Sequence, residues 1–452
     1  MTSWNRPRVS LAVLLSSLVL SACGPRTPVA EPTNTVPCVD TPADCPALHS
    51  PAETSEEAKI RNVILLIGDG MGPQQIGLLE LYARYAQDPR YPERTSHIGR
   101  MIHGSKTTVV ISTPADGLVN ESATGATQLA TGVPTKFGYL GLNEAGEPVD
   151  SAVDLARSLG MRTGIISDTR LTHATPASFG AHVHDRWDEN HIAEQLVESG
   201  TDVMLSGGWR YFLPKSAATS AQRGAVATRY GIPEDQVRST RADERDLLAE
   251  ASAAGYTIAT SVEALRAAEG SRLLGLFAAS GMQTGTQWLQ ERDEEIPSQP
   301  SLAELFRVGV RFLNQDPERG FFLMLEGGQI DWAGHATKAQ LLLHEMLRFD
   351  ETVAEVMRFA QEDGETAVIL TADHETGGFS IFYDRKGPPG PEIFEDLDAY
   401  PNYVRFATSA HTHTPVYGVF NAPESLTRPI PSLLHQTEVG EVVNAWVRIA
   451  GE

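Results

Sequence analysis

Short apolar runs alternate with longer amphipathic stretches along the chain from Arg61 onward. The longer stretches repeat their apolar residues every three or four positions, as surface helices do, and they are residues 151–159, 189–199, 301–315 and 338–360. The short runs are rich in Val, Ile, Leu and Phe, as buried strands are, and they are residues 62–70, 106–112, 163–168, 202–208, 273–278, 321–328 and 366–374. This alternation predicts an α/β fold, a three-layer sandwich with a central, mostly parallel sheet covered by helices on both faces.

Acidic and histidine side chains stand where three of the predicted strands end. Asp69 closes the first run, Glu326 closes the run 321–328, and Asp373 with His374 closes the last run. In open parallel sheets, ligands bind beyond the carboxyl ends of the strands. We therefore expect these side chains to meet at one edge of the sheet.

The segment LMLEGGQIDWAGH, residues 323–335, adds two further candidates, Asp331 and His335. Their four-residue spacing places both on one face of a helical turn, and buried carboxylates need a partner or a cation. Near the C-terminus, AHTHTPV supplies His411 and His413. Each signal alone is weak, because an Asp after a strand is usually a cap and a lone His is usually a surface residue. Their joint occurrence favours a metal site, and mixed Asp and His ligands suit zinc, whereas all-oxygen sites suit magnesium.

Ser122 begins a run of small residues, NESATGATQLATG, at 120–132. A serine in this position is most often a helix N-cap. It could instead be a nucleophile, because the amides of a helix N-terminus stabilise negative charge. No G-x-S-x-G motif surrounds it, so a metal would have to activate its hydroxyl.

Seven motifs together resemble the successive motifs of the alkaline phosphatase family. They occur in the family's order between about residues 62 and 416, and they are GDGMG (68–72), ESATGAT (121–127), THATP (172–176), HDRW (184–187), LEGGQIDWAGH (325–335), TADHETGG (371–378) and AHTHTPV (410–416). The resemblance implies an alkaline-phosphatase-like sandwich that hydrolyses phosphate monoesters. Its implied cofactors are two Zn²⁺ ions and one Mg²⁺ ion.

The resemblance also implies a role for each matching residue. Ser122 would be the nucleophile that forms a phosphoserine intermediate, and Arg186 would clamp two phosphate oxygens. The implied ligands are Asp331, His335 and a C-terminal histidine for one zinc, Asp69, Asp373 and His374 for the second zinc, and Asp69, Thr175 and Glu326 for magnesium. The H-T-x-x-P-V spacing favours His411 as the C-terminal ligand, with His413 as the alternative.

Two positions vary among members of the resembled family. His173 stands in THATP where some members have Asp, and Trp332 follows Asp331 where others have Lys or His. We expect both side chains to surround the ligands and to affect magnesium affinity and pH optimum, without ligating a metal themselves.

The N-terminus is typical of an exported protein. Residues 1–22 form a predicted signal peptide, in which two arginines precede a short apolar stretch. The sequence LSAC then resembles a bacterial lipobox with Cys23 as the lipidated residue; the alternative is an ordinary secretory peptide. Residues 23–60 form a predicted Pro/Thr/Ala-rich tether, in which Cys38 and Cys45 could form a disulfide.

The remaining residues, 61–452, are the predicted catalytic domain. The full chain has 452 residues, of which 41% are hydrophobic, and this supplies enough apolar material for a large core. Residues 215–250 are charged and rich in Ala and Ser, so they read as a peripheral insertion, and residues 383–403 read as a surface loop. We expect the protein to be periplasmic or on the cell surface, anchored to the outer membrane through Cys23.

The formal charge of −22 argues against a nucleic-acid surface. The expected partners are small phosphorylated substrates, and the resemblance suggests a homodimer. A phosphodiesterase of the same superfamily is the main alternative, although Thr175, Glu326 and Arg186 supply a third metal site and a dianion clamp that a diester needs less. A non-catalytic phosphate- or metal-binding lipoprotein is a second alternative. A sulfatase is a weaker one, because Ser122 is not followed by the Pro and Arg of the sulfatase signature.

Overall fold

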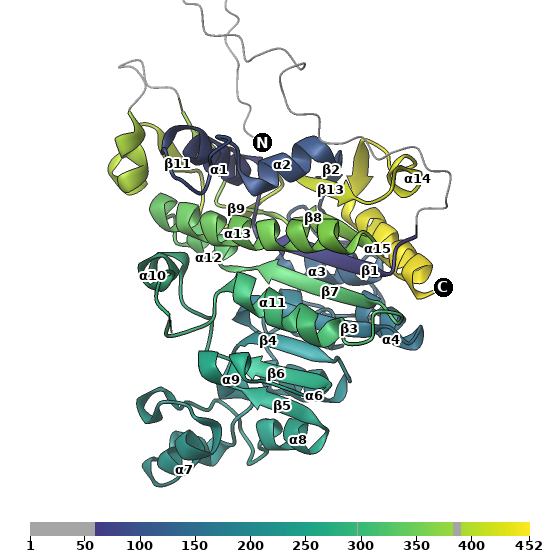
Figure 1. Cartoon of the computed structure of the whole chain (residues 1–452), viewed down its shortest axis with the longest axis vertical. Coiled ribbons are helices and arrows are strands. Elements are labelled where there is room, and N and C mark those ends of the chain that lie inside the picture. The colour runs from purple at the N-terminus through teal and green to yellow at the C-terminus, as the bar shows by residue number, and fades with distance from the viewer. Residues whose placement is uncertain (1–58, 296, 383–389) are drawn as a thin grey trace, which may run out of the picture. The chain divides into compact units, whose positions relative to one another are not determined.

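The computed structural model describes residues 59–295, 297–382 and 390–452. Among these residues, ten strands form one sheet in the order β14-β2-β13-β8-β1-β7-β3-β4-β6-β5 (Figure 1). Their bounds are β1 Asn62–Gly68, β2 Lys106–Ile111, β3 Arg162–Arg170, β4 Val203–Gly207, β5 Tyr256–Ala259, β6 Arg272–Leu276, β7 Phe321–Gly327, β8 Thr366–Thr371, β13 Val416–Asn421 and β14 Leu433–His435. Strand β13 is antiparallel to both neighbours, β2 and β8, and the other pairings are parallel.

The centre of the sheet is built from the most continuously apolar strands. Every residue of β1, β7 and β8 is buried, and the paired residues lie in register, with Leu65 opposite both Met324 and Ile369. A strand that is buried on both faces needs apolar side chains at successive positions, not at alternate ones. All seven predicted strands are present, whereas β5, β13 and β14 were not predicted.

Helices cover both faces of the sheet, which confirms the predicted three-layer α/β fold. In Figure 1, α11 (Leu302–Leu313) and α13 (Ala339–Asp363) pass in front of the strands. They contact β3, β4, β7 and β8. On the other face, α3 (Ser122–Thr131), α4 (Ala152–Ser158) and α15 (Gln436–Gly451) lie behind the strands. Helix α15 contacts β1, and α4 contacts β3 and β7.

Shorter elements complete the described chain. The remaining α-helices are α1 Pro73–Tyr85, α2 His97–Gly104, α5 Ala174–Ala177, α6 Glu189–Glu198, α7 Ser220–Tyr230, α8 Leu247–Ala253, α9 Val262–Arg266, α10 Gly285–Glu291, α12 Gln329–His335 and α14 Glu424–Thr427. The short strands are β9 Glu375–Thr376, β10 Phe379–Ile381, β11 Val404–Phe406 and β12 His411–Thr412. The segment 215–250, expected to be an insertion, contains α7 and part of α8. Within 390–403, two 3-10 turns bury Ile393 and Leu397.

Several sequence predictions lie outside the described residues. They are the signal peptide 1–22, the lipidation of Cys23, nearly all of the tether at 23–60, and the disulfide between Cys38 and Cys45. In the described part of the chain, none of the helices has both the length and the apolar character needed to cross a membrane.

The order of the central strands determines which loops meet. Strand β1 lies between β8 and β7, with all three parallel. The ends of these strands therefore bring three segments that are distant in sequence to one edge of the sheet.

Candidate active site

Hydrogen bonds from two backbone amides join the ends of β1, β7 and β8. The amide of Asp69 donates to the carbonyl of Gly327 at 3.3 Å, and the amide of Gly70 donates to Asp373 Oδ1 at 3.2 Å. Gly70 has a φ of +72°, and a Cβ there would lie 2.9 Å from the Cα of Asp331. Only glycine combines this conformation with this close approach. The GDGMG motif thus allows the loop after β1 to touch the loops after β7 and β8.

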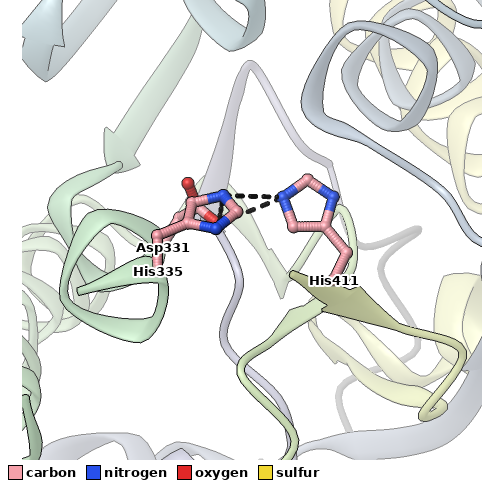
Figure 2. Close-up of side chains that lie close together, drawn as sticks. All are labelled: Asp331, His335 and His411. Carbon is pink, nitrogen blue, oxygen red and sulfur yellow. Dashed lines mark hydrogen bonds and ion pairs between the residues drawn. The ribbon is translucent and has the colours of Figure 1, made fainter. Parts of the chain in front are cut away.

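Asp331, His335 and His411 form the first group of donor atoms (Figure 2). Helix α12 places Asp331 and His335 one turn apart, as their spacing predicted, and His411 approaches from β12. Asp331 Oδ1 lies 3.3 Å from His335 Nε2 and 3.4 Å from His411 Nε2. The candidate ligand atoms of the three residues all lie within 4.8 Å of one another. His413, the alternative to His411, is exposed and lies outside this group.

Hydrogen bonds to backbone carbonyls orient both imidazoles of this group. His335 Nδ1 lies 2.7 Å from the carbonyl oxygen of Ser409, and His411 Nδ1 lies 2.9 Å from that of Asn120. A carbonyl can only accept, so each Nδ1 carries a proton and Nε2 is the ring nitrogen left to bind a metal ion. The two Nε2 atoms face each other at 3.0 Å beside the Asp331 carboxylate. Two ring nitrogens and a carboxylate oxygen in such proximity suit a bound cation.

Asp69, Asp373 and His374 form the second group, and each is buried. His374 Nε2 lies 3.5 Å from Asp69 Oδ1 and 3.3 Å from Asp373 Oδ2. Burial lowers the pKa of His374 well below its usual value, so the ring is neutral. Both oxygens of Asp69 and Oδ2 of Asp373 lack a hydrogen-bond donor. Buried carboxylate oxygens without donors are costly unless a cation replaces the missing partners.

Asp69 also belongs to a third group, with Glu326 and His173. Glu326 Oε2 accepts hydrogen bonds from Ser167 and from Thr169, the latter at 3.3 Å, whereas Glu326 Oε1 has no partner. Burial raises the pKa of Glu326 to about 8, and the nearby Thr175 hydroxyl opposes that rise. His173, which we expected only to surround the ligands, therefore offers a ring nitrogen to this group.

The nucleophile candidate, Ser122, lies at the start of α3 and beside the second group. Its Oγ is 3.4 Å from His374 Nε2, and the side chain is 2% exposed. The N-cap reading of Ser122 is wrong, because Glu121 occupies that position and accepts hydrogen bonds from the amides of Ala123 and Thr124 at 2.9 Å. The Ser122 hydroxyl is therefore free to face the cluster of ligands.

Arg186 connects the nucleophile to the third group. Its guanidinium donates to the Glu121 carboxylate, and its Nη2 lies 3.3 Å from His173 Nε2. Trp332 packs edge-on against the ring of His173, with the ring centroids 5.8 Å apart. The structure thus brings the candidate residues that the sequence identified together at this edge of the sheet, with the exception of His413.

Sequence reasoning missed three residues that support this site. Glu121 caps α3 and pairs with Arg186, Thr376 donates to Asp331, and Asp168 accepts from the amides of Gly328 and Gln329 at the start of α12. Asp168 carried the same signal as Asp69, an acidic residue at a strand end. Glu121 and Thr376 lie within the motifs ESATGAT and TADHETGG, in which only Ser122, Asp373 and His374 were identified as candidates.

Fold and donor groups together define an α/β protein that can hold several cations beside a buried serine. The chain belongs to the alkaline phosphatase family, whose family model matches residues 60–405.

Individual relatives extend this result. The chain is 33% identical to "Alkaline phosphatase 4" of Bacillus subtilis over 73% of its own length and 64% of that relative's, so it spans just under two thirds of that protein. Alkaline phosphatase from the Antarctic bacterium TAB5 is 26% identical, with a TM-score of 0.67 over 86% of this chain and 98% of that one. The Thermus thermophilus enzyme is 22% identical, with a TM-score of 0.69 over 88% and 94%, and it shows the shared fold.

Replacing His411 by Ala tests the first donor group. We expect retention of the bound metal to fall by at least about 100-fold, because loss of a direct ligand exceeds the usual 10- to 100-fold cost of losing a residue that only supports a ligand. His413→Ala is the matched control, since this exposed histidine lies two positions away in the same segment. Elemental analysis after dialysis measures the effect, and equal zinc loss in both variants would contradict the assignment.

Metal removal makes stability depend on pH in a defined direction. Burial raises the pKa of Glu326 from 4.5 to about 8 and that of Asp373 from 3.8 to about 7. At pH values between the ordinary and the raised pKa of each carboxyl, the metal-free folded chain binds more protons than the unfolded chain. Its free energy of unfolding therefore falls as the pH rises. The stabilising effect of these protons is complete below the ordinary pKa values and is lost above about pH 8.

Thermal unfolding of chelator-treated and metal-loaded protein measures this dependence. We expect the Tm of the metal-free protein to decrease across this pH range, and the Tm of the loaded protein to decrease less, because cations replace the protons. Glu326→Gln is the control, since it removes one of the titrating groups and makes the slope of the metal-free protein shallower. A metal-free Tm that rises with pH would contradict the argument.

Proposed function

We propose that this protein hydrolyses phosphate monoesters in a metal-dependent reaction that passes through a phosphoserine at Ser122. The observation that carries the proposal is the position of the Ser122 hydroxyl, 3.4 Å from a neutral His374 within a cluster of buried, unpaired carboxylate oxygens. Membership of the alkaline phosphatase family supports the same activity.

The chain's own residues account for the first half of the reaction. Ser122 Oγ attacks phosphorus, the bond from phosphorus to the ester oxygen breaks, and the substrate's alcohol leaves. Arg186 binds the non-bridging oxygens, for which its planar fork of donors is suited.

A second displacement completes the turnover. Water attacks the phosphoserine, the bond between phosphorus and Oγ breaks, and inorganic phosphate is released with Ser122 restored. Two inversions give net retention at phosphorus. When bound, the cations would supply the charge that acidifies the Ser122 hydroxyl and neutralises the leaving oxygen.

The donor sets suggest which metal each group holds. The two groups that mix carboxylates with His335, His411 or His374 suit zinc, so we propose one Zn²⁺ in each. We propose Mg²⁺ beside Asp69, Glu326 and Thr175, where oxygen donors dominate. A variant of the TAB5 enzyme with a histidine replaced by aspartate has Mg bound in its M3 site. By analogy, we expect His173 to weaken the binding of magnesium to the third group relative to an aspartate.

Ser122→Ala tests the serine mechanism. We expect kcat/KM for an aryl phosphate monoester to fall by on the order of 10³-fold or more, because the covalent route is lost. Zinc and magnesium contents should stay unchanged, since Ser122 is not needed as a ligand. Unaltered turnover in this variant would refute the mechanism. A wild-type preference for a phosphate diester over the monoester would instead favour the phosphodiesterase alternative.

Localisation and assembly follow from the sequence and the family resemblance. We propose that the protein is exported, is tethered to a membrane by a lipid on Cys23, acts on small phosphorylated substrates and forms a homodimer. Native mass spectrometry of protein from its own membrane fraction measures the lipid tether and the homodimer. We expect a dimer whose subunits begin at an acylated Cys23, whereas an unacylated monomer would count against both.

A further inference from the structure

Four residues from distant parts of the chain form a buried hydrogen-bond cluster beneath the active site. Three are side chains, Ser112 after β2, Asn120 before α3, and Gln436 as the first residue of α15. Gln436 is fully buried, and Asn120 is 2% exposed. The fourth partner is the backbone of Asp373. Gln436 and Ser112 touch neither Ser122 nor a candidate metal ligand's side chain, so their function is not explained by the reaction described above.

The amide of Gln436 can adopt only one orientation in this cluster. Its Nε2 lies 2.9 Å from the carbonyl oxygen of Asp373 and 3.2 Å from that of Ala372. Its Oε1 lies 2.7 Å from Asn120 Nδ2. The reverse orientation would place an acceptor against two carbonyls and a donor against a donor. Gln436 therefore joins the loop after β8 to the segment that precedes Ser122.

Ser112 closes the cluster from a second side. Its Oγ accepts from Asn120 Nδ2 at 2.7 Å and lies 2.6 Å from the Asp373 carbonyl and 2.7 Å from Gln436 Oε1. Its single proton satisfies one of those two acceptors. Every group of the cluster thus has a partner, and an unpaired one would be costly at this burial.

The cluster reaches both the nucleophile and two of the donor groups through Asn120 and Asp373. The carbonyl of Asn120 accepts from His411 Nδ1, and its Oδ1 accepts from the amide of Glu121 at 3.1 Å. Asp373 and the next residue, His374, contribute donor atoms to the second group. A displacement of Asn120 would therefore move the turn of Ser122 and the ring of His411 together.

We propose that Gln436 is a positioning residue that holds the turn of Ser122 in register with the loop of Asp373 and His374. The C-terminal helix α15 is then part of the catalytic apparatus, although it lies beyond the region of the family match, which ends at residue 405. The inference rests on the proposed phosphatase function.

Gln436→Met tests this role, because methionine keeps the length of the side chain and removes every hydrogen bond. Asn444→Leu is the matched control. Asn444 is a buried amide on the same helix, and its Nδ2 donates to the carbonyl of Thr131 at the far end of α3 from Ser122. Both variants lose a buried side-chain amide that joins α15 to α3 or to the segment before it. Only Gln436→Met loses an amide that lies beside the candidate active site.

Three measurements on the metal-loaded, full-length protein separate positioning from general stability. In Gln436→Met we expect kcat/KM to fall by about 10- to 100-fold and zinc release to a chelator to accelerate by a similar factor. We also expect faster amide hydrogen exchange in segments 112–124 and 372–376. In Asn444→Leu we expect a lower Tm, with activity and zinc release within about twofold of the wild type.

Two outcomes would overturn the proposal. The first is a Gln436→Met protein whose kcat/KM and zinc release match those of Asn444→Leu. If Gln436→Met does not fold, Ser112→Ala provides the test, since it removes one hydroxyl from the same cluster. The second overturning outcome is a Ser112→Ala protein in which zinc release and amide hydrogen exchange are the same as in the wild type. If the wild-type protein turned over no phosphate monoester, the proposed function would be refuted instead. The amide hydrogen exchange measurement would still show whether Gln436 holds the cluster together.

Discussion

Mutual repulsion among buried carboxylates is the constraint on which this site depends. Asp69, Glu326, Asp331 and Asp373 converge on the same edge of the sheet, and all four are almost completely buried. Burial raises the pKa of Asp69 well above its usual value, and the charges of Asp373, Asp331 and Glu326 raise it further. Arg186 is the cation that opposes this rise, and its guanidinium already pairs with Glu121. The fold therefore gathers more carboxylates at this edge than its own cations can neutralise, and bound metal ions would supply the balance.

The scaffold holds this unfavourable cluster by making its surroundings rigid. The residues 63–67 of β1, 321–325 of β7 and 367–370 of β8 are all apolar and buried, and such close packing resists separation of the carboxylates that follow. Burial alone would raise the pKa of Asp331, but hydrogen bonding from His411 holds it below its usual range. The imidazoles of His335 and His411 are each fixed by a backbone carbonyl. The electrostatic repulsion between the carboxylates is thus offset by the stability of the core, as is common where function requires groups of like charge to lie together.

The sequence predicted the central fold and the candidate ligands for the same reason. A strand buried on both faces must be apolar throughout, and a polar residue that ends such a strand stands out against it, as Asp69 and Asp373 do. Strand β14 has only three residues, and β13, with VYGVFN, carries no strong strand pattern, so neither could be predicted. Support from the backbone was also invisible, because the carbonyls of Ser409 and Asn120 that orient the histidines carry no side-chain signal. Gln436 is a single amide at the start of a helix, and only the folded chain shows that it reaches Asp373.

Arg186, the proposed phosphate clamp, illustrates how these supports combine. One nitrogen of Arg186 pairs with Glu121, whose carboxylate also accepts from the amides that begin α3 and from the amide of Gly138 at 3.0 Å. Another nitrogen of Arg186 lies against His173, which belongs to the third donor group. Arg186 is therefore tied on one side to the helix that carries Ser122 and on the other side to a candidate metal-ligand group. Since the proposed nucleophile, the proposed clamp and the candidate ligands share these contacts, phosphate binding and metal binding at this site would involve one connected set of side chains.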